Sequence, residues 1–260
     1  MQNLVEKAEN LEPVSMYTIT AKLFTHLKKS IINQFGVSGQ LALDEGIRNV
    51  IEEQISEIRK HTGNPNYSVN KEALFSSDHL ADSQKVEQTF FLYKEIQEKE
   101  GLEAHTIYAV MARIFAHVSK AMVEQFGEQG REAVLNGVRT FGEERGRDIA
   151  RRAAAAGKPN TKDHYLSNYD MGRSDLFEYE TTFHPTEIEQ TFTKCAFGEQ
   201  WKKDGMHEYG ILYCQMIDPA IAKGFNPNFE VIHDRYILKE GECHFRFQMK
   251  DDGDEKHGNQ

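Results

Sequence analysis

A sequence repeat constrains the N-terminal half of this chain more strongly than any other feature. Residues 23–53 align without gaps on residues 114–144, so each residue is aligned with the one 91 positions later. The identities include Phe24 with Phe115, His26 with His117, Gln34–Gly36 with Gln125–Gly127, Gly39 with Gly130, Ala42 with Ala133, Gly46 with Gly137, Arg48 with Arg139, and Glu53 with Glu144. A duplicated structural unit is the simplest explanation.

Each copy is predicted to form a helix, a glycine break and a second helix. In the second copy, apolar residues recur at three- and four-residue spacing, as on one face of a helix: Ile107, Val110, Met111, Ile114, Phe115, Val118 and Met122. Gly127 follows where a left-handed residue ends such a helix, and a further helix over 129–155 is expected.

Three glycines lie inside this further helix, at Gly137, Gly142 and Gly146. An interior glycine costs a helix roughly 1 kcal/mol relative to alanine, so their presence predicts close packing against the backbone. A neighbouring helix is the favoured occupant, and a ligand is the alternative.

The apolar pattern changes to a period of two after Asp175, which is typical of strands with one buried face. Strands are predicted over 177–183, 188–193, 229–238 and 243–250, and helices over 196–203 and 209–223. The prediction is an α+β fold, with duplicated helical hairpins followed by a four-stranded antiparallel sheet that has helices on one face.

Polar stretches rich in glycine, proline and asparagine divide the chain at 63–83 and 157–160. We therefore expect a first helical copy with its linker over 1–103, a second copy over 104–160 and an α+β domain over 161–250. The charged segment 251–260 is expected to be disordered.

Charge and hydropathy exclude several kinds of partner. The net charge is -10, whereas binding a nucleic-acid backbone requires clustered Lys and Arg. No run of about eighteen apolar residues is present, and the first residues lack the apolar stretch of a signal peptide. We expect a cytoplasmic protein that binds a small-molecule substrate and neither nucleic acid nor membrane. The sequence leaves open whether the chain forms a homo-oligomer.

All three cysteines lie in the last third of the chain, at Cys195, Cys214 and Cys243. An odd number without a Cys-x-x-Cys pair favours reduced thiols. Cys195 is predicted between a strand and a helix, where backbone N–H groups and the helix dipole should lower its pKa. Cys214 and Asp218 should share one helix face. Cys243 should face the core, because it lies on the same side of a strand as Phe245.

Three interpretations of the thiols remain open. They can be small buried apolar groups, since free cysteine is among the most buried residue types. One can be a nucleophile, with Asp218 moving protons. The three sulfurs can also surround zinc together with Asp218 or His244, although their spacing matches no ordinary zinc ribbon. The sequence identifies no cofactor.

The segment from Phe177 to Met249 contains a strand ending in cysteine, a Cys-x-x-x-Asp helix, a Phe-Asn-Pro turn and a closing Gly-x-Cys-x-Phe-Arg strand. In this order the motifs resemble the L-2-amino-thiazoline-4-carboxylic acid hydrolase family. The resemblance implies hydrolytic opening of a cyclic amidine, with a site at Cys195, Cys214, Asp218 and Cys243. The first helical copy departs from shorter family members, and it would replace a subunit contact or line the pocket.

A carboxylate on the substrate would need a cationic partner, for which arginine is well suited. Arg246 and Arg139 are the candidates, although Arg246 can simply face solvent and Arg139 can pair with Glu143. Asn226 is a third candidate for substrate binding, and its default role is to form the turn. The repeated histidines are expected to serve packing.

Two functional hypotheses follow. The first is a hydrolase that opens a C–N or C–S bond of a small cyclic amidine-type heterocycle such as 2-amino-thiazoline-4-carboxylate, by a cysteine nucleophile or by water attack assisted by Cys and Asp. The alternative is a non-catalytic ligand-binding or redox-sensing protein on the same frame.

Overall fold

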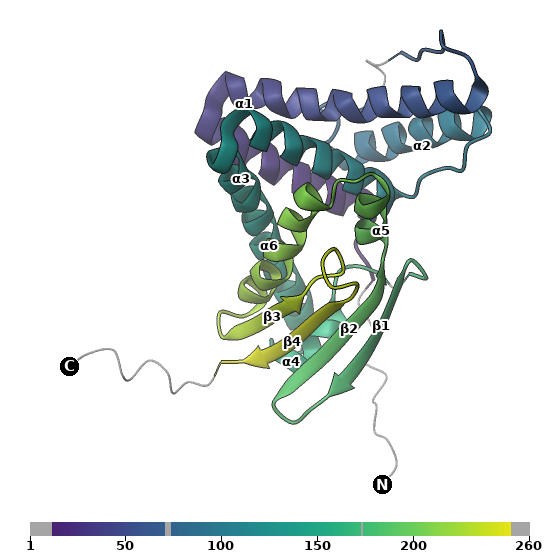
Figure 1. Cartoon of the computed structure of the whole chain (residues 1–260). Coiled ribbons are helices and arrows are strands. Elements are labelled where there is room, and N and C mark those ends of the chain that lie inside the picture. The colour runs from purple at the N-terminus through teal and green to yellow at the C-terminus, as the bar shows by residue number, and fades with distance from the viewer. Residues whose placement is uncertain (1–11, 71–73, 173, 251–260) are drawn as a thin grey trace.

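The computed structural model describes residues 12–70, 74–172 and 174–250 (Figure 1). The segment 251–260, for which we predicted disorder, lies outside the described residues. Two long kinked helices, a shorter helix beside them and a sheet with its own helices make up the described chain. Within the described residues, none of the helices combines the length and the apolar character that crossing a membrane requires.

The two long helices are α1 (Met16–Thr62) and α3 (Ile107–Ala155). Each bends at a matched glycine with nearly the same backbone angles, φ 56° and ψ −134° at Gly36 and φ 59° and ψ −135° at Gly127. Residues other than glycine rarely adopt a positive φ, so the two glycines permit the bend. The predicted glycine breaks are therefore sharp kinks between two helical arms.

Matched positions of α1 and α3 contact one another with their partners exchanged. His26 Nε2 lies 2.9 Å from Glu144 Oε2, and His117 Nε2 lies 2.9 Å from Glu53 Oε2. The rings of Phe35 and Phe126 stack at 4.0 Å between centroids. Such exchange is what an approximate two-fold arrangement of two copies produces. Both histidines thus hold α1 to α3, as expected for a structural role.

Close backbone packing follows the same exchange. A Cβ at Gly46 would lie 2.6 Å from Val118 Cα, and a Cβ at Gly137 would lie 2.9 Å from Leu27 Cα. Leu27 and Val118 are themselves matched positions of the two copies. Glycine at both places therefore allows the two helices to approach closely.

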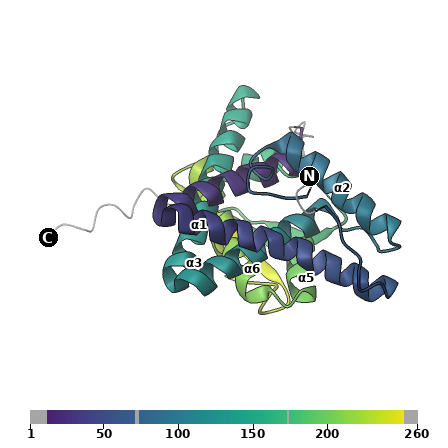
Figure 2. The same cartoon turned by 90° about the horizontal axis from the view of Figure 1, so that it is seen from above.

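The shorter helix α2 (Ser83–Lys99) packs against the second arm of α1 (Figures 1 and 2). It begins at Asp82, whose side chain accepts hydrogen bonds from the backbone N–H groups of Gln84 and Lys85. Helix α2 has no matched element after α3, where the chain instead enters the sheet domain. The two copies are thus covered by different partners.

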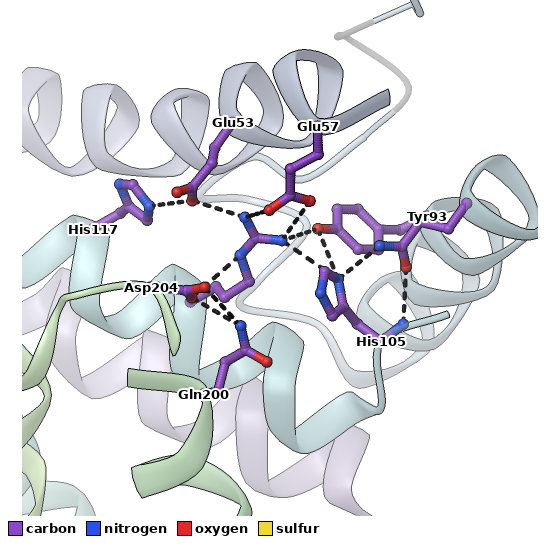
Figure 3. A network of polar contacts seen from close by, with 9 residues as sticks. Glu53, Glu57, Tyr93, His105, His117, Gln200 and Asp204 are labelled. Atoms are coloured by element: carbon purple, nitrogen blue, oxygen red, sulfur yellow. Dashed lines mark hydrogen bonds and ion pairs between the residues drawn. The ribbon is translucent and has the colours of Figure 1, made fainter. Parts of the chain in front are cut away.

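A buried arginine joins the two copies to the sheet domain (Figure 3). Arg113 of α3 is 0% exposed, and its Nη2 lies 2.8 Å from Glu53 and 2.9 Å from Glu57 of α1. Its Nη1 donates to the Tyr93 hydroxyl of α2 at 3.2 Å, and its Nε lies 3.5 Å from Asp204. The three carboxylates and the hydroxyl compensate the buried charge.

The sheet consists of β1 (Phe177–Phe183), β2 (Glu187–Cys195), β3 (Phe229–Arg235) and β4 (Cys243–Met249). All neighbours are antiparallel, in the order β1-β2-β4-β3. Helices α5 (Ala196–Lys203) and α6 (His207–Phe225) lie between β2 and β3 in sequence, after the short α4 (Lys162–Tyr165) and the 3-10 turn Leu166–Asn168. The predicted α+β fold is confirmed.

The glycines of the second arm of α3 face a helix, as predicted. A Cβ at Gly142 would lie 2.6 Å from Ala220 Cβ, and one at Gly146 would collide with the Ile221 carbonyl oxygen, both on α6. On α6, Gly224 faces the Glu143 backbone in return. Helix α6 is thereby pressed against α3 on one side while it contacts β3 on the other.

Candidate active site

The three cysteines come from three elements around the inner side of the sheet. Cys195 is the last residue of β2, Cys243 the first of β4, and Cys214 lies in α6. Cys243 stands in the buried row with Phe245, as predicted, and is 5% exposed. All three are free thiols, and Cys195 and Cys214 are partly exposed.

Ile237, in the connection between β3 and β4, links two of the thiols. Its backbone N–H donates to Cys243 Sγ at 3.2 Å. Its side chain lies against Gly198, where an added Cβ would be 2.7 Å from Ile237 Cγ2 and 3.8 Å from Cys195 Cβ. The start of β4 and the start of α5 therefore meet at this residue.

Asp218 lies one turn beyond Cys214 on α6, as predicted from their spacing. Its side chain is 24% exposed, although protein surrounds the carboxyl group. Burial raises the pKa of Asp218 to about 6, and the charge of Arg145 opposes that rise. A carboxyl group with this pKa exchanges a proton near neutral pH, which suits general acid–base chemistry.

The predicted pKa of Cys195 is wrong in direction. The backbone N–H groups of Phe197 and Gly198, at the start of α5, do lower its pKa. Burial outweighs them and raises the pKa of Cys195 to about 11. Burial also raises the pKa of Cys243 to about 12 and that of Cys214 well above its ordinary value. The thiols are therefore protonated at neutral pH.

The charges of these groups affect one another's pKa values. After burial, the charges of Cys195, Cys243 and Asp218 are the causes that raise the pKa of Cys214. Asp218 also raises the pKa of Cys195 and of Cys243. Since such effects fade quickly with distance, one negative charge in this region disfavours a second.

His233 of β3 is a site residue that the sequence did not reveal. Its Nδ1 donates to the Cys214 carbonyl oxygen at 3.2 Å and lies 4.0 Å from Asp218 Oδ2. The ring lies against Tyr236 and Phe245, with both centroid distances at 4.0 Å. Burial lowers the pKa of His233 to about 4, so the ring is neutral. Its place in an alternating strand was the one available signal.

Arg145 is the second unpredicted residue. It lies in the glycine-bearing arm of α3 and is 2% exposed. Its Nε and Nη2 donate to the two oxygens of Asp170 at 2.9 and 2.5 Å, and its guanidinium lies over the rings of Phe141 and Tyr169. The ion pair supplies a fixed positive charge near Asp218 while Asp170 balances that charge.

The three predicted substrate-binding residues have polar partners away from the thiols. Arg246 alternates onto the opposite side of β4, is 39% exposed and lies 3.8 Å from Asp234. Arg139 is exposed on α3 and donates to Asn136. Asn226 donates to the Asn160 carbonyl oxygen at 2.8 Å and accepts from the Asn228 backbone, as a turn former does. The structure does not bring these side chains into the cysteine cluster.

A zinc site finds no geometric support. Across the ranges that the structure describes, no three or more His, Cys, Asp or Glu side chains are grouped as metal ligands. His244, proposed as a fourth ligand, points to the opposite side of β4, where its two ring nitrogens contact Asp234 and Glu189 at 2.6 Å.

Two shallow recesses lie on the helical half of the molecule. One, of about 230 Å³, is bordered by Lys22, His26 and Glu144, and the other, of about 250 Å³, by His79 and Lys85. Neither is bordered by a cysteine. Both recesses therefore lie apart from the thiols.

Comparison with known proteins gives one family match and weak structural similarities. Two H-NOX structures share 12% and 14% identity with the chain, cover 89% and 91% of it and 95% and 96% of their own length, and give TM-scores of 0.23 and 0.21. TM-scores this low do not establish a common fold. No curated protein matches the chain. The family model for L-2-amino-thiazoline-4-carboxylic acid hydrolase matches residues 107–247, more than half of the sequence, and this chain belongs to that family.

Proposed function

We propose that the protein hydrolyses a C–N or C–S ring bond of a small cyclic amidine, such as 2-amino-thiazoline-4-carboxylate. The family name supports a hydrolase. The observation that carries the proposal is that Asp218 and Cys214 lie one turn apart on α6, while Ile237 contacts Cys243 and packs at Gly198, beside Cys195.

The charges of this region suit the cationic amidinium end of such a substrate. His233 is neutral, and Arg145 is balanced by Asp170, so Asp218 is the charge left to pair with a ligand. A cyclic amidine binds a proton readily and becomes a planar cation. An amidinium about 4 Å from a carboxylate gains about 4 kcal/mol at the effective dielectric constant of a protein surface. The same cation would lower the pKa of nearby thiols.

Cys195 is the proposed nucleophile. The backbone N–H groups of Phe197 and Gly198 lower its pKa, which favours a thiolate, and its side chain is partly exposed. Cys243 is buried, and its sulfur accepts the Ile237 N–H. Cys214 lacks comparable compensation for its burial. Among the three thiols, Cys195 therefore requires the least energy to ionise.

The proposed reaction has two steps. Asp218 takes the thiol proton of Cys195, the sulfur bonds to the amidine carbon, and the ring bond from that carbon to nitrogen or sulfur breaks. The leaving atom receives the proton from Asp218. Water then attacks the same carbon and the bond to Cys195 breaks, which returns the thiol and releases a carbamoyl product. The net change is the addition of one water molecule.

Turnover of 2-amino-thiazoline-4-carboxylate by purified variants tests the proposal. We expect Cys195→Ser and Asp218→Asn to lose at least about a hundredfold in kcat/KM, the ordinary scale for a nucleophile or base. His244→Asn is the matched control, since His244 lies on the opposite side of the sheet, and it should retain activity. Wild-type rates from both Cys195→Ser and Asp218→Asn would contradict the proposal.

A further inference from the structure

Strand β1 forms one edge of the sheet and, among the described residues, pairs with β2 alone (Figure 1). Tyr179 of β1 stands opposite Phe192, which stands opposite Cys243, so Tyr179 lies on the inner face of the sheet. Phe183 lies on the same face, because side chains alternate along a strand. Yet Tyr179 is 41% exposed and Phe183 is 68% exposed. Aromatic side chains exposed beside an open strand edge mark a surface to which another strand can add.

The backbone groups of β1 that do not face β2 belong to three residues. The His184 N–H donates to the Glu187 carbonyl oxygen at 2.9 Å, so His184 faces β2. In an antiparallel ladder both backbone groups of a residue point to the same neighbouring strand, and successive residues alternate between the two sides. The register is unbroken over 179–183, so the N–H and C=O groups of Tyr179, Thr181 and Phe183 point to the free edge.

We infer that β1 pairs with β1 of a second copy of this chain, antiparallel about a two-fold axis at Thr181, and joins the two four-stranded sheets into one. This register pairs Tyr179 with Phe183 of the partner subunit and Thr181 with its own copy. Each of these pairs exchanges two hydrogen bonds, and aromatic and threonine pairs of this kind stabilise a sheet. An axis at Thr182 would instead place Tyr179 opposite Pro185, which has no N–H to donate.

The two glutamates of β1 disfavour the registers on the other side of Thr181. An axis at Glu180 would set the two copies of Glu180 directly opposite each other, and an axis at Tyr179 would set Glu178 opposite Glu180. Like charges directly opposite destabilise a strand pair. With the axis at Thr181, Glu178 faces His184 of the partner subunit instead. The charges of this edge therefore select one register. The inference is independent of the proposed hydrolysis, because β1 carries none of the proposed catalytic residues.

Sedimentation equilibrium of the full chain tests the inference. A single short strand pair buries little area, so we expect a reversible dimer with a Kd of roughly 1–100 μM. Thr181→Pro removes an N–H that points away from β2, a change that an edge strand tolerates, and should raise the Kd at least tenfold. Thr181→Val keeps that N–H and should dimerise as wild type does. Circular dichroism checks that each variant is folded.

A side-chain variant tests the same edge without proline. Phe183→Lys changes a residue that is exposed in the single chain, and it should raise the Kd by about tenfold, because both symmetric pairs with Tyr179 are lost. Val37→Lys is the matched control. Val37 is 77% exposed on α1, away from β1, and its replacement should leave the Kd unchanged.

Cysteine crosslinking measures the register itself. In the inferred dimer the two copies of residue 181 lie about 5.5 Å apart between Cα atoms, within the reach of a disulfide. The two copies of residue 182 lie on a diagonal of about 7–8 Å. With oxidised glutathione, Thr181→Cys should form a covalent dimer whose disulfide maps to residue 181, and Thr182→Cys should not. A wild-type protein that stays monomeric throughout, a dimer unaffected by both Thr181→Pro and Phe183→Lys, or crosslinking of Thr182→Cys in place of Thr181→Cys would overturn the inference.

Discussion

Asp218 follows Cys214 by one turn of α6, and both side chains stay partly exposed although protein surrounds them. Helix α6 can hold them there because Gly142 and Gly146 let it approach the backbone of α3. The arrangement keeps a carboxyl group in a region where burial disfavours its charge. Such a placement costs stability and favours reactivity.

Replacing Asp218 by Asn should stabilise the protein at neutral pH. Burial raises the pKa of Asp218 from 3.8 to about 6, so the folded state holds this proton more tightly than the unfolded chain. The group's favourable contribution is complete below about pH 4 and is lost as the pH rises through about 6. The gap between the two pKa values corresponds to about 3 kcal/mol, and we expect a gain of about 1–3 kcal/mol at pH 7.5.

Urea unfolding at pH 7.5 and pH 4.5 measures this effect. The advantage of Asp218→Asn should shrink at the lower pH, where the Asp218 carboxyl group of the folded protein is protonated and as neutral as the asparagine amide. Asp175→Asn, at an exposed position, is the control and should change the free energy of unfolding by less than about 0.5 kcal/mol. If Asp218→Asn gains nothing at pH 7.5 relative to pH 4.5, the raised pKa is refuted.

Replacing Glu53 by Gln should destabilise the protein, with the opposite pH dependence. The hydrogen bond from His117 and the charge of Arg113 lower the pKa of Glu53 to about 2 from 4.5, against the effect of burial. The stabilisation is present above about pH 5 and disappears as the pH falls toward 2. Allowing for the partial exposure of Glu53, we expect a loss of about 1–2 kcal/mol at pH 7.

Glu144→Gln is the matched control, because Glu144 occupies the equivalent place in the other copy. Its partner is His26, and the neighbouring cation is Lys22, which is 36% exposed where Arg113 is fully buried. The loss at pH 7 should be smaller for Glu144→Gln than for Glu53→Gln. Equal losses in chemical denaturation would show that burial of Arg113 adds nothing to the pair.

Replacing Gly146 by Ala should destabilise the protein, although alanine favours helices. The added methyl group would collide with the Ile221 carbonyl oxygen and lie 2.5 Å from the Phe225 nitrogen. Overpacking of this kind typically costs about 1–3 kcal/mol. Gln129→Ala on the exposed side of α3 should change the free energy of unfolding by less than about 0.5 kcal/mol. Thermal unfolding of both variants separates packing from helix propensity, and an unchanged midpoint for Gly146→Ala would refute the close approach.

Replacing Arg145 by Met should lower the free energy of unfolding and change the pH dependence of activity. Loss of one partner leaves Asp170 charged and buried, which typically costs about 3–5 kcal/mol. The Arg145 charge lowers the pKa of Asp218, so its removal should move the acid limb of the kcat/KM profile to higher pH. The double variant with Asp170→Asn should recover stability but retain the shifted profile. A double variant with the wild-type profile would exclude Arg145 as a source of that charge.

The sequence predicted the elements of the C-terminal domain because their signals are local. Periodicity and turn residues placed a helix over 196–203 and four strands within one or two residues of the observed ones, except that β3 ends three residues early, at Arg235, where Tyr236 begins a turn. The contacts of His233 and Arg145 join elements distant in sequence, so the local pattern could place His233 in an alternating strand but could not assign a role to either residue.

The same distinction explains the error at Cys195. The helix start that lowers its pKa is a local feature, whereas the packing of α5, α6 and β4 that raises it is tertiary. Arg246 was assigned to substrate binding by residue type alone, although strand alternation directs it to the side of β4 opposite Cys243.

Rapid-quench mass spectrometry during turnover of 2-amino-thiazoline-4-carboxylate tests the central claim most directly. The account predicts that wild-type protein gains the mass of one substrate molecule, that the added mass maps to the peptide containing Cys195, and that Cys195→Ser neither gains it nor turns over substrate. Consumption of substrate by Cys195→Ser at the wild-type rate would contradict the account.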